Sequence, residues 1–309
     1  MIDKKIYTVV DIGSNTVKCA VFLRRKDKAY EIASDTEKLG LIAGIRDGRL
    51  TEERTDALCR TVERFRLLGL AKANENGIGA ENASIHCFAT AALRGVDNFD
   101  EINAKVAERV GASVVLLSAE EEARTAFAGF RTLNAEPEKG ILADMGGGST
   151  ELTEFSGNEI IRLTSMAFGC LSLYKRFCAG EFPTPEEEEK IYAYAADRTA
   201  DGGFAGSGGT LCAVGGTGNA IRRLLGKYGI GGDNTLTPDH LDALRARLSS
   251  HDPEDIALIE KLIPTRRETI IPGLCAYSAI ARAIGADKIM LLKGGLREGI
   301  MKELLDKYE

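Results

Sequence analysis

Short runs of apolar residues that end in glycine turns recur along the chain, and this pattern is typical of strands joined by tight turns. Residues 6–11 form the first apolar run, and the chain then turns at residues 13–15. Every second residue after this turn is apolar: Val17, Cys19, Val21 and Leu23. A period of two indicates a half-buried strand. We therefore predict that the chain begins with a β-hairpin.

Strands and helices are predicted to alternate after the hairpin. The first half should contain a further strand from residue 30, a helix after Thr51, a strand at 84–90, a helix at 99–109 and a strand at 113–117. The second half should contain strands at 141–145 and 151–155, a helix at 181–198, a strand and helix within 211–225 and, after Thr237, two helices, a strand and a closing helix. This alternation predicts an α/β fold.

The second half begins in the same way as the first. Aligning residues 11–22 with residues 144–155 pairs Asp11 with Asp144, and both segments read as strand, Asp-x-Gly turn and strand. Internal repeats indicate a duplicated architecture. We therefore predict two lobes of one α/β plan around a central cleft. The lobes should comprise residues 1–124 and 125–309, and the last helix could pack back on the first lobe.

Composition narrows the class of protein. With 309 residues, 44% of them hydrophobic and 28% charged, the chain has the size and balance of a two-domain globular protein. No apolar run reaches the roughly 18 to 20 residues of a membrane span, and the start does not read as a signal peptide, so we expect a cytoplasmic protein with no membrane partner. A net charge of −6 argues against a broad nucleic-acid surface. The oligomeric state stays open, and a homodimer is one possibility.

Cysteine and histidine do not form a metal-ligand pattern. The seven cysteines are scattered without a CxxC pair, and the three histidines have no HExxH spacing. Any metal should therefore be held by oxygen ligands, which favours Mg²⁺ or Mn²⁺.

Three glycine turns follow apolar strands, at residues 13–15, 146–150 and 215–219. Backbone N–H groups in such turns can converge on phosphate oxygens, because glycine allows a close approach. One such turn would read as a tight turn only, but the recurrence favours phosphate binding. Asp11 and Asp144 precede two of the turns. Each could cap its own turn or point toward a hydrated metal, and we favour the metal, more strongly for Asp144.

Three glutamates stand at the start of a predicted helix in the segment SAEEEAR, residues 118–124. Ser118 and Glu121 fit a capping box, which gives Glu121 a structural role. Glu120 and Glu122 remain in the first turn. Their structural role would be to complement the helix dipole, but the same dipole keeps a glutamate ionised, as a general base requires.

Seven motifs in order resemble the exopolyphosphatase and guanosine-pentaphosphate phosphatase family, which has a duplicated actin-like ATPase (ribonuclease H-like) fold. They are DIGSNTVKCAVF (11–22), ATAALR (89–94), SAEEEAR (118–124), DMGGGSTEL (144–152), FGC (168–170), RRETIIPG (266–273) and GGLREG (294–299). The chain would be a short, two-domain form without the C-terminal HD-type domain of longer members. One departure is the third glycine turn, which reads VGGTGN where GTSGT is commoner.

The resemblance implies a role for individual residues. Glu122 matches the catalytic base, while Asp144 and Glu151 match the acidic residues tied to magnesium, with Glu151 also counted as catalytic. The phosphate-binding positions would be Asn15, Arg94, Gly147, Gly148, Ser149, Cys170 and Arg266. Basic residues that could hold the rest of a substrate chain are Lys175, Arg176, Arg222, Arg223, Lys227 and Arg266, although an exposed helix face explains Arg223 and Lys227 equally well.

The function that follows is release of terminal orthophosphate from inorganic polyphosphate, with short to medium chains favoured because few basic residues are available. Three alternatives stay open: hydrolysis of guanosine pentaphosphate in the same site, a kinase of the same fold, and a non-catalytic sensor of polyphosphate or nucleotide. The retained acidic residues argue against the sensor, and the glutamate of SAEEEAR argues against the kinase.

Overall fold

The computed structural model describes residues 4–231 and 235–307. The chain forms two compact units, Met1–Gly129 with Leu296–Glu309, and Phe130–Gly295. The sequence placed the boundary after residue 124, but α3 (Ala119–Leu133) continues through that point, so no loop marks it. The last helix belongs to the first unit. Among the described residues, no helix is both long enough and apolar enough to cross a membrane.

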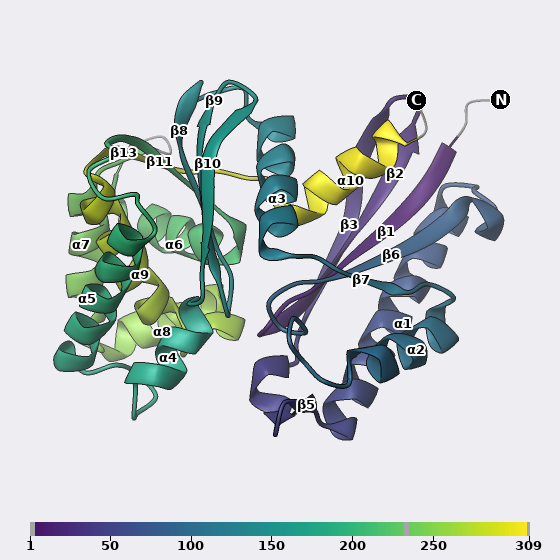
Figure 1. Cartoon of the computed structure of the whole chain (residues 1–309), viewed down its shortest axis with the longest axis horizontal. Helices are drawn as coiled ribbons and strands as arrows, with labels where there is room; N and C mark the ends of the chain where they lie inside the picture. Colours follow the sequence, from purple (N-terminus) through teal and green to yellow (C-terminus); the bar gives the residue numbers. More distant parts are fainter. Residues whose placement is uncertain (1–3, 232–234, 308–309) are drawn as a thin grey trace. The chain divides into compact units, whose positions relative to one another are not determined.

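The first unit is built on a five-stranded sheet with the order β3-β2-β1-β6-β7. Its strands are β1 (Lys4–Ile12), β2 (Thr16–Arg25), β3 (Lys28–Lys38), β6 (Ala83–Ala89) and β7 (Val114–Leu116). The first three are antiparallel neighbours, and β6 and β7 continue the sheet in parallel (Figure 1). The helices are α1 (Glu52–Glu75), α2 (Phe99–Val110), the start of α3 and α10 (Leu296–Asp306), and a small ribbon joins β4 (Ile45–Arg46) to β5 (Arg49–Leu50).

The alternation along β1 sends its side chains into two separate cores. Ile6 and Val10 lie in a cluster with Leu58 and Phe65 of α1. Tyr7 and Val9 point to the opposite face and pack with residues of α10, namely Leu296, Ile300, Met301 and Leu304. Because both faces of the sheet are covered, β1 is almost fully buried from residue 6 to residue 10.

Helix α10 also contacts α3 closely. Thr125 donates a hydrogen bond from Oγ1 to Glu303 at 2.8 Å. A Cβ at Gly299 would lie 1.8 Å from the carbonyl oxygen of Thr125. Glycine is therefore required at position 299 by the approach of the two helices.

We expect Gly299→Ala to destabilise the protein by about 3 kcal/mol, because the new methyl group meets backbone that moves only with the helix. Thermal or denaturant unfolding measures this loss. The matched control is Gly226→Ala, also within a helix, where a Cβ has no neighbour within 4 Å. That substitution should leave stability unchanged or raise it slightly. Equal stability of the two variants would contradict the close contact.

The second unit is built on a six-stranded sheet with the order β10-β9-β8-β11-β13-β12. Its strands are β8 (Lys139–Met145), β9 (Thr150–Ser156), β10 (Glu159–Met166), β11 (Gly209–Val214), β12 (Thr235–Leu236) and β13 (Ala286–Leu291). Its helices are α4 (Cys170–Phe177), α5 (Pro185–Asp201), α6 (Gly215–Tyr228), α7 (Pro238–Leu248), α8 (Pro253–Leu262) and α9 (Ile270–Ile284). Helix α9 is buried along most of its length and is the centre of the core.

The two units share one plan. In each, three antiparallel strands are followed by two strands that continue the sheet in parallel. The hairpin turns also agree, because the N–H of Gly13 donates to Thr16 O at 3.2 Å and the N–H of Gly146 donates to Ser149 O at 3.0 Å. The repeat predicted from the sequence is therefore a structural duplication. Strand β10 and helices α4 and α8 are elements that the sequence pattern did not predict.

Candidate functional site

Two of the three glutamates at the start of α3 have local structural roles. The carboxylate of Glu121 accepts a hydrogen bond from the N–H of Ser118 at 2.8 Å, and Ser118 Oγ accepts one from the N–H of Glu121 at 3.2 Å. The bond from the Ser118 N–H lowers the pKa of the Glu121 carboxyl from its ordinary value. Glu120 forms an exposed ion pair with Arg124 at 2.8 Å. The predicted capping box is therefore confirmed.

Glu122 differs from its two neighbours. Its carboxylate accepts a hydrogen bond from Arg94 Nη2 at 2.5 Å, and its side chain is 13% exposed. Arg94 is itself fixed, because its Nε donates to the carbonyl of Leu117 at 3.1 Å, directly after β7. The structure thus brings together two residues that the sequence assigned to the site. A carboxylate held in this way can accept a proton from a neighbouring water.

The first glycine turn places Asp11 opposite Lys18 on the β1–β2 hairpin. Asp11 Oδ2 lies 3.9 Å from Lys18 Nζ. Asn15 is 7% exposed, and its carbonyl accepts hydrogen bonds from the N–H groups of Leu39 and Gly40 at 3.1 and 2.8 Å. The turn is therefore tied to the segment that follows β3.

The second glycine turn places two carboxylates together instead of an ion pair. Asp144 and Glu151 are direct partners on β8 and β9, so their side chains project from the same face of the sheet. Glu151 is buried and accepts a hydrogen bond from Ser165 Oγ of β10 at 2.8 Å. Asp144 contacts Gly215, where a Cβ would lie 2.3 Å from its Oδ1. Ser165 was not predicted, because it belongs to the strand that the sequence pattern missed.

The loop between β8 and β9 packs on the start of α4. The N–H of Cys170 donates to Gly146 O, and the N–H groups of Leu171 and Ser172 donate to Gly147 O, at 2.9–3.0 Å. A Cβ at Gly169 would lie 2.5 Å from Gly146 O, so the glycine of the FGC motif permits this contact.

Two backbone N–H groups of the loop can donate hydrogen bonds to a ligand. Among the hydrogen bonds of the described residues, the N–H groups of Gly147 and Gly148 donate none. These amides are therefore available to an anion, as the sequence predicted for the loop. Ser149, the next predicted phosphate-binding residue, is 6% exposed at the end of the same loop.

Thr217 is a buried hub that connects three parts of the second unit. Its Oγ1 donates to Met145 O at 3.1 Å, at the end of β8, and lies 3.7 Å from Cys170 Sγ at the start of α4. Arg266 Nη1 donates to the same Oγ1 at 3.1 Å and lies 3.9 Å from Cys170 Sγ. Cys170 is 1% exposed, and its predicted role in phosphate binding stays a prediction. The sequence showed Thr217 only as part of a glycine turn.

Gly216 leaves the space that the Arg266 guanidinium occupies, because a Cβ there would lie 1.9 Å from Nη2. We expect Gly216→Ala to displace the guanidinium while costing little stability, since the end of an arginine side chain can move. If Arg266 binds substrate, KM should rise several-fold with a smaller effect on kcat. Gly226→Ala, further along α6, is the matched control, and an unchanged KM for Gly216→Ala would argue against a binding role for Arg266.

The other basic residues predicted for the substrate lie away from the glycine loop. Lys175 is exposed in the last turn of α4, at the opposite end of the helix from the loop. Arg222 is partly buried and contacts Asn219 Oδ1 at 3.5 Å. Arg223 and Lys227 are exposed on α6. These positions stay predictions, because nothing in the structure brings them to the loop.

Two carboxylates could serve as oxygen ligands for a metal. Within residues 4–231 and 235–307, no group of three or more His, Cys, Asp or Glu side chains is arranged to hold a metal ion. Asp144 and Glu151 provide two carboxylates from paired strands. Mg²⁺ usually binds through one or two carboxylates, several waters and the phosphates of a substrate, so this pair suits Mg²⁺. Asp11 as a third ligand stays a prediction, and Lys18 Nζ lies 3.9 Å from its carboxylate.

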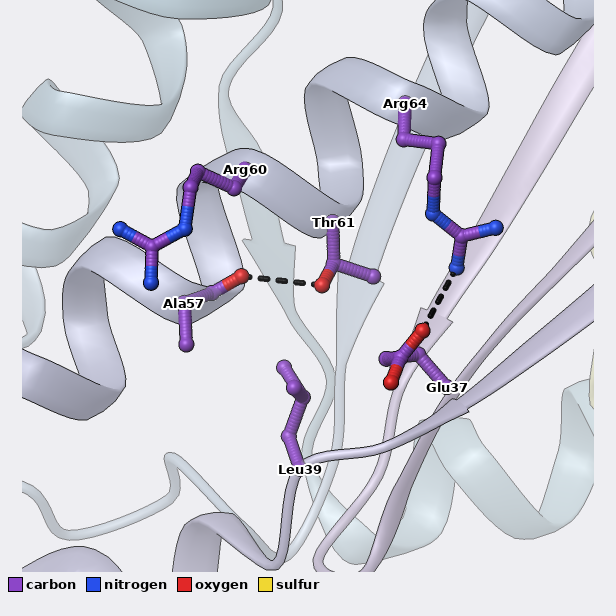
Figure 2. A pocket seen from close by; sticks show the side chains of 6 residues that line it. All are labelled: Glu37, Leu39, Ala57, Arg60, Thr61 and Arg64. Carbon is purple, nitrogen blue, oxygen red and sulfur yellow. Dashed lines mark hydrogen bonds and ion pairs between the residues drawn. The ribbon is translucent and has the colours of Figure 1, made fainter.

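A separate hollow of about 270 Å³ lies between β3 and α1, as Figure 2 shows. Its lining residues are Glu37, Leu39, Ala57, Arg60, Thr61 and Arg64. Arg64 donates to Glu37 at 2.9 Å and also pairs with Asp35, while Thr61 Oγ1 donates to the carbonyl of Ala57. None of the predicted site residues lines this hollow.

Comparison with known proteins identifies relatives over most of the chain. A model of the Ppx/GppA phosphatase family matches residues 21–308. A guanosine-5'-triphosphate,3'-diphosphate pyrophosphatase of Pseudoalteromonas atlantica is 26% identical over 99% of this chain, which spans 60% of that relative.

Solved structures agree in fold. An exopolyphosphatase from Cytophaga hutchinsonii matches with a TM-score of 0.83 and 20% identity, covering 98% of both chains. The Ppx/GppA family member of Aquifex aeolicus matches with a TM-score of 0.79 and 20% identity, covering 99% of both. The predicted duplicated α/β fold is confirmed.

Proposed function

Because the chain belongs to the Ppx/GppA phosphatase family, whose members are phosphoanhydride hydrolases, we propose that it is an exopolyphosphatase. It would release terminal orthophosphate from inorganic polyphosphate. The observation that carries the proposal is that the three glutamates at the start of α3 have different partners. Glu121 caps the helix, Glu120 pairs with Arg124, and only Glu122 is held by an arginine of another segment.

In the proposed reaction, Glu122 accepts a proton from water as the water oxygen bonds to the terminal phosphorus. The bridging P–O bond breaks at the same centre, and the shortened chain leaves with the electron pair. The N–H groups of Gly147 and Gly148 and the guanidinium of Arg266 would bind the phosphate oxygens, whose charge develops during the transfer. Mg²⁺ or Mn²⁺, bound by Asp144 and Glu151, would neutralise phosphate charge.

Hydrolysis of guanosine pentaphosphate is the second candidate. The relative of Pseudoalteromonas atlantica is a guanosine-5'-triphosphate,3'-diphosphate pyrophosphatase, which favours it. The groups gathered around the glycine loop are amides, carboxylates and a guanidinium. All of them recognise phosphate or a cation, as binding of polyphosphate requires. We also propose that the protein acts in the cytoplasm, on inorganic polyphosphate or guanosine pentaphosphate.

We expect phosphate release to be faster on short and medium polyphosphates than on chains of hundreds of units. Each added phosphate needs a positive charge to offset it, and Arg266 is the basic side chain that the structure places at the loop. Measuring phosphate release from polyphosphates of graded length and from guanosine pentaphosphate tests both the length preference and the choice of substrate. Faster release from guanosine pentaphosphate would replace the first candidate by the second. Binding without release from either substrate would instead indicate a sensor.

A further inference from the structure

A group of basic residues lies at the end of the first unit's sheet, where β1 begins and the β2–β3 hairpin turns. Lys4 is the direct partner of Arg25, and Arg25 is the direct partner of Lys28. The three side chains therefore stand in a row on one face of three neighbouring strands. Lys26 adds a fourth positive charge in the turn itself. We call Lys4, Arg25, Lys26 and Lys28 the basic hairpin cluster.

The cluster is costly to the folded protein. Like charges directly opposite each other on neighbouring strands are destabilising. Lys26 also has φ of 59°, in a left-handed conformation that glycine, asparagine and aspartate adopt more readily than lysine. Both the position and the conformation therefore disfavour lysine or arginine here.

The side chains of the basic hairpin cluster are not ion-paired within the described residues. All four residues of the cluster are exposed, and within residues 4–231 and 235–307 none of them forms an ion pair. Asp27, in the same turn, is the adjacent acidic residue. The chain as a whole carries a net charge of −6, so the cluster is a local exception to its acidic character. Exposed and without an ion-pair partner among the described residues, these side chains are open to an anionic ligand.

We propose that the basic hairpin cluster is a second binding site for inorganic polyphosphate, remote from the residues that release phosphate. This inference rests on the proposed function, which supplies a linear polyanion as substrate. A strand rises roughly 3.3 Å per residue, which puts Lys4 roughly 23 Å from Asp11 along β1. Tripolyphosphate and guanosine pentaphosphate are too short to occupy both regions, whereas a longer chain can.

Binding at two points explains a length dependence. Once one part of a chain is bound, the other part binds from a high effective concentration. Affinity increases once a chain is long enough to occupy both regions. It does not increase further with length, because the cluster is small. The cluster therefore favours medium chains over the shortest ones and gives little further advantage to very long chains.

Nucleic acid is the competing ligand. Tyr30 is 49% exposed and stands two residues after Lys28, on the same face of β3. An aromatic ring beside a basic row can stack on a base, whereas polyphosphate has no base to stack. Proteins with a broad nucleic-acid surface are usually basic, whereas this chain is acidic. Polyphosphate is recognised by charge alone, so it fits this small cluster better than nucleic acid does. Substitution of Tyr30 therefore distinguishes binding of nucleic acid from binding of polyphosphate.

The experiment measures binding of medium-length polyphosphate, tripolyphosphate and a single-stranded oligonucleotide by calorimetry. A Glu122→Gln background keeps the chains intact. Arg25→Gln with Lys28→Gln should weaken binding of medium chains about tenfold at low salt and flatten the salt dependence, while leaving tripolyphosphate unchanged. The matched control, Arg46→Gln with Arg60→Gln, removes two exposed charges from the same unit and should have little effect. Tyr30→Ala should bind polyphosphate normally.

Three results would overturn the inference: equal weakening by the control pair, an equal loss for tripolyphosphate, or oligonucleotide binding that needs Tyr30 and exceeds polyphosphate binding. Unfolding curves of the variants show whether they are folded, so a general loss of structure is recognised. The proposed function fails separately. A wild-type protein that binds polyphosphate through the cluster but releases no phosphate from it refutes the activity and leaves the cluster intact.

Discussion

Glu122→Gln is expected to reduce phosphate release by roughly 10²- to 10⁴-fold, the usual contribution of a general base. Substrate affinity should change little, because glutamine keeps the shape of the side chain and its amide oxygen can still accept the hydrogen bond from Arg94. Steady-state phosphate release gives kcat, and calorimetry with tripolyphosphate gives the affinity. A large fall in kcat at constant affinity is the signature of a lost base.

The neighbouring glutamates provide matched controls for this prediction. Glu121→Gln removes the ionised acceptor of the Ser118 N–H and should lower thermal stability modestly while activity persists. Glu120→Gln removes an exposed ion pair with Arg124 and should have almost no effect. If Glu121→Gln is inactive and Glu122→Gln is active, the base has been assigned to the wrong glutamate.

Removal of divalent metal is expected to abolish phosphate release, and Mg²⁺ or Mn²⁺ should restore it. Asp144→Asn should raise the metal concentration needed for half-maximal activity. Loss of a residue that merely orients a metal ligand costs roughly 10- to 100-fold in affinity, and loss of a ligand should cost at least as much. Titration of metal against activity, and of metal against the protein by calorimetry, gives two independent measures.

Asp11→Asn is the matched control, since Asp11 is the counterpart of Asp144 in the first unit. Lys18 lies beside Asp11, so the rise in metal requirement should be smaller than for Asp144→Asn. An equal rise would support Asp11 as a third ligand. Full activity in the presence of a strong chelator would contradict the metal-dependent mechanism.

The sequence predicted those parts of the fold that repeat a local pattern. The period of two after residue 17 and the Asp-x-Gly turns at Asp11 and Asp144 gave the hairpins and their duplication. Ser118 and Glu121 gave the start of α3, because a capping box is a contact between residues three positions apart. In each case neighbouring residues determine the structure, so periodicity and spacing contain the information.

Contacts between distant segments were beyond such reasoning. Thr217 meets Arg266, Cys170 and Met145, which no periodicity connects. Gly169 is required by a loop more than twenty positions earlier in the chain. Family resemblance pointed to Arg94 and Glu122, and the structure added that they contact each other. The register that aligns Lys4, Arg25 and Lys28 likewise becomes visible only once the strands are paired.

The position opposite each turn aspartate differs between the two copies of the shared plan. A tandem duplication starts with identical halves, and each half can then lose what the other retains. The first copy has lysine there, at Lys18, and its hairpin carries its own counterion. The second has Glu151, and its hairpin brings two carboxylates together. One residue in each hairpin thus decides whether the turn aspartate faces a positive or a negative partner.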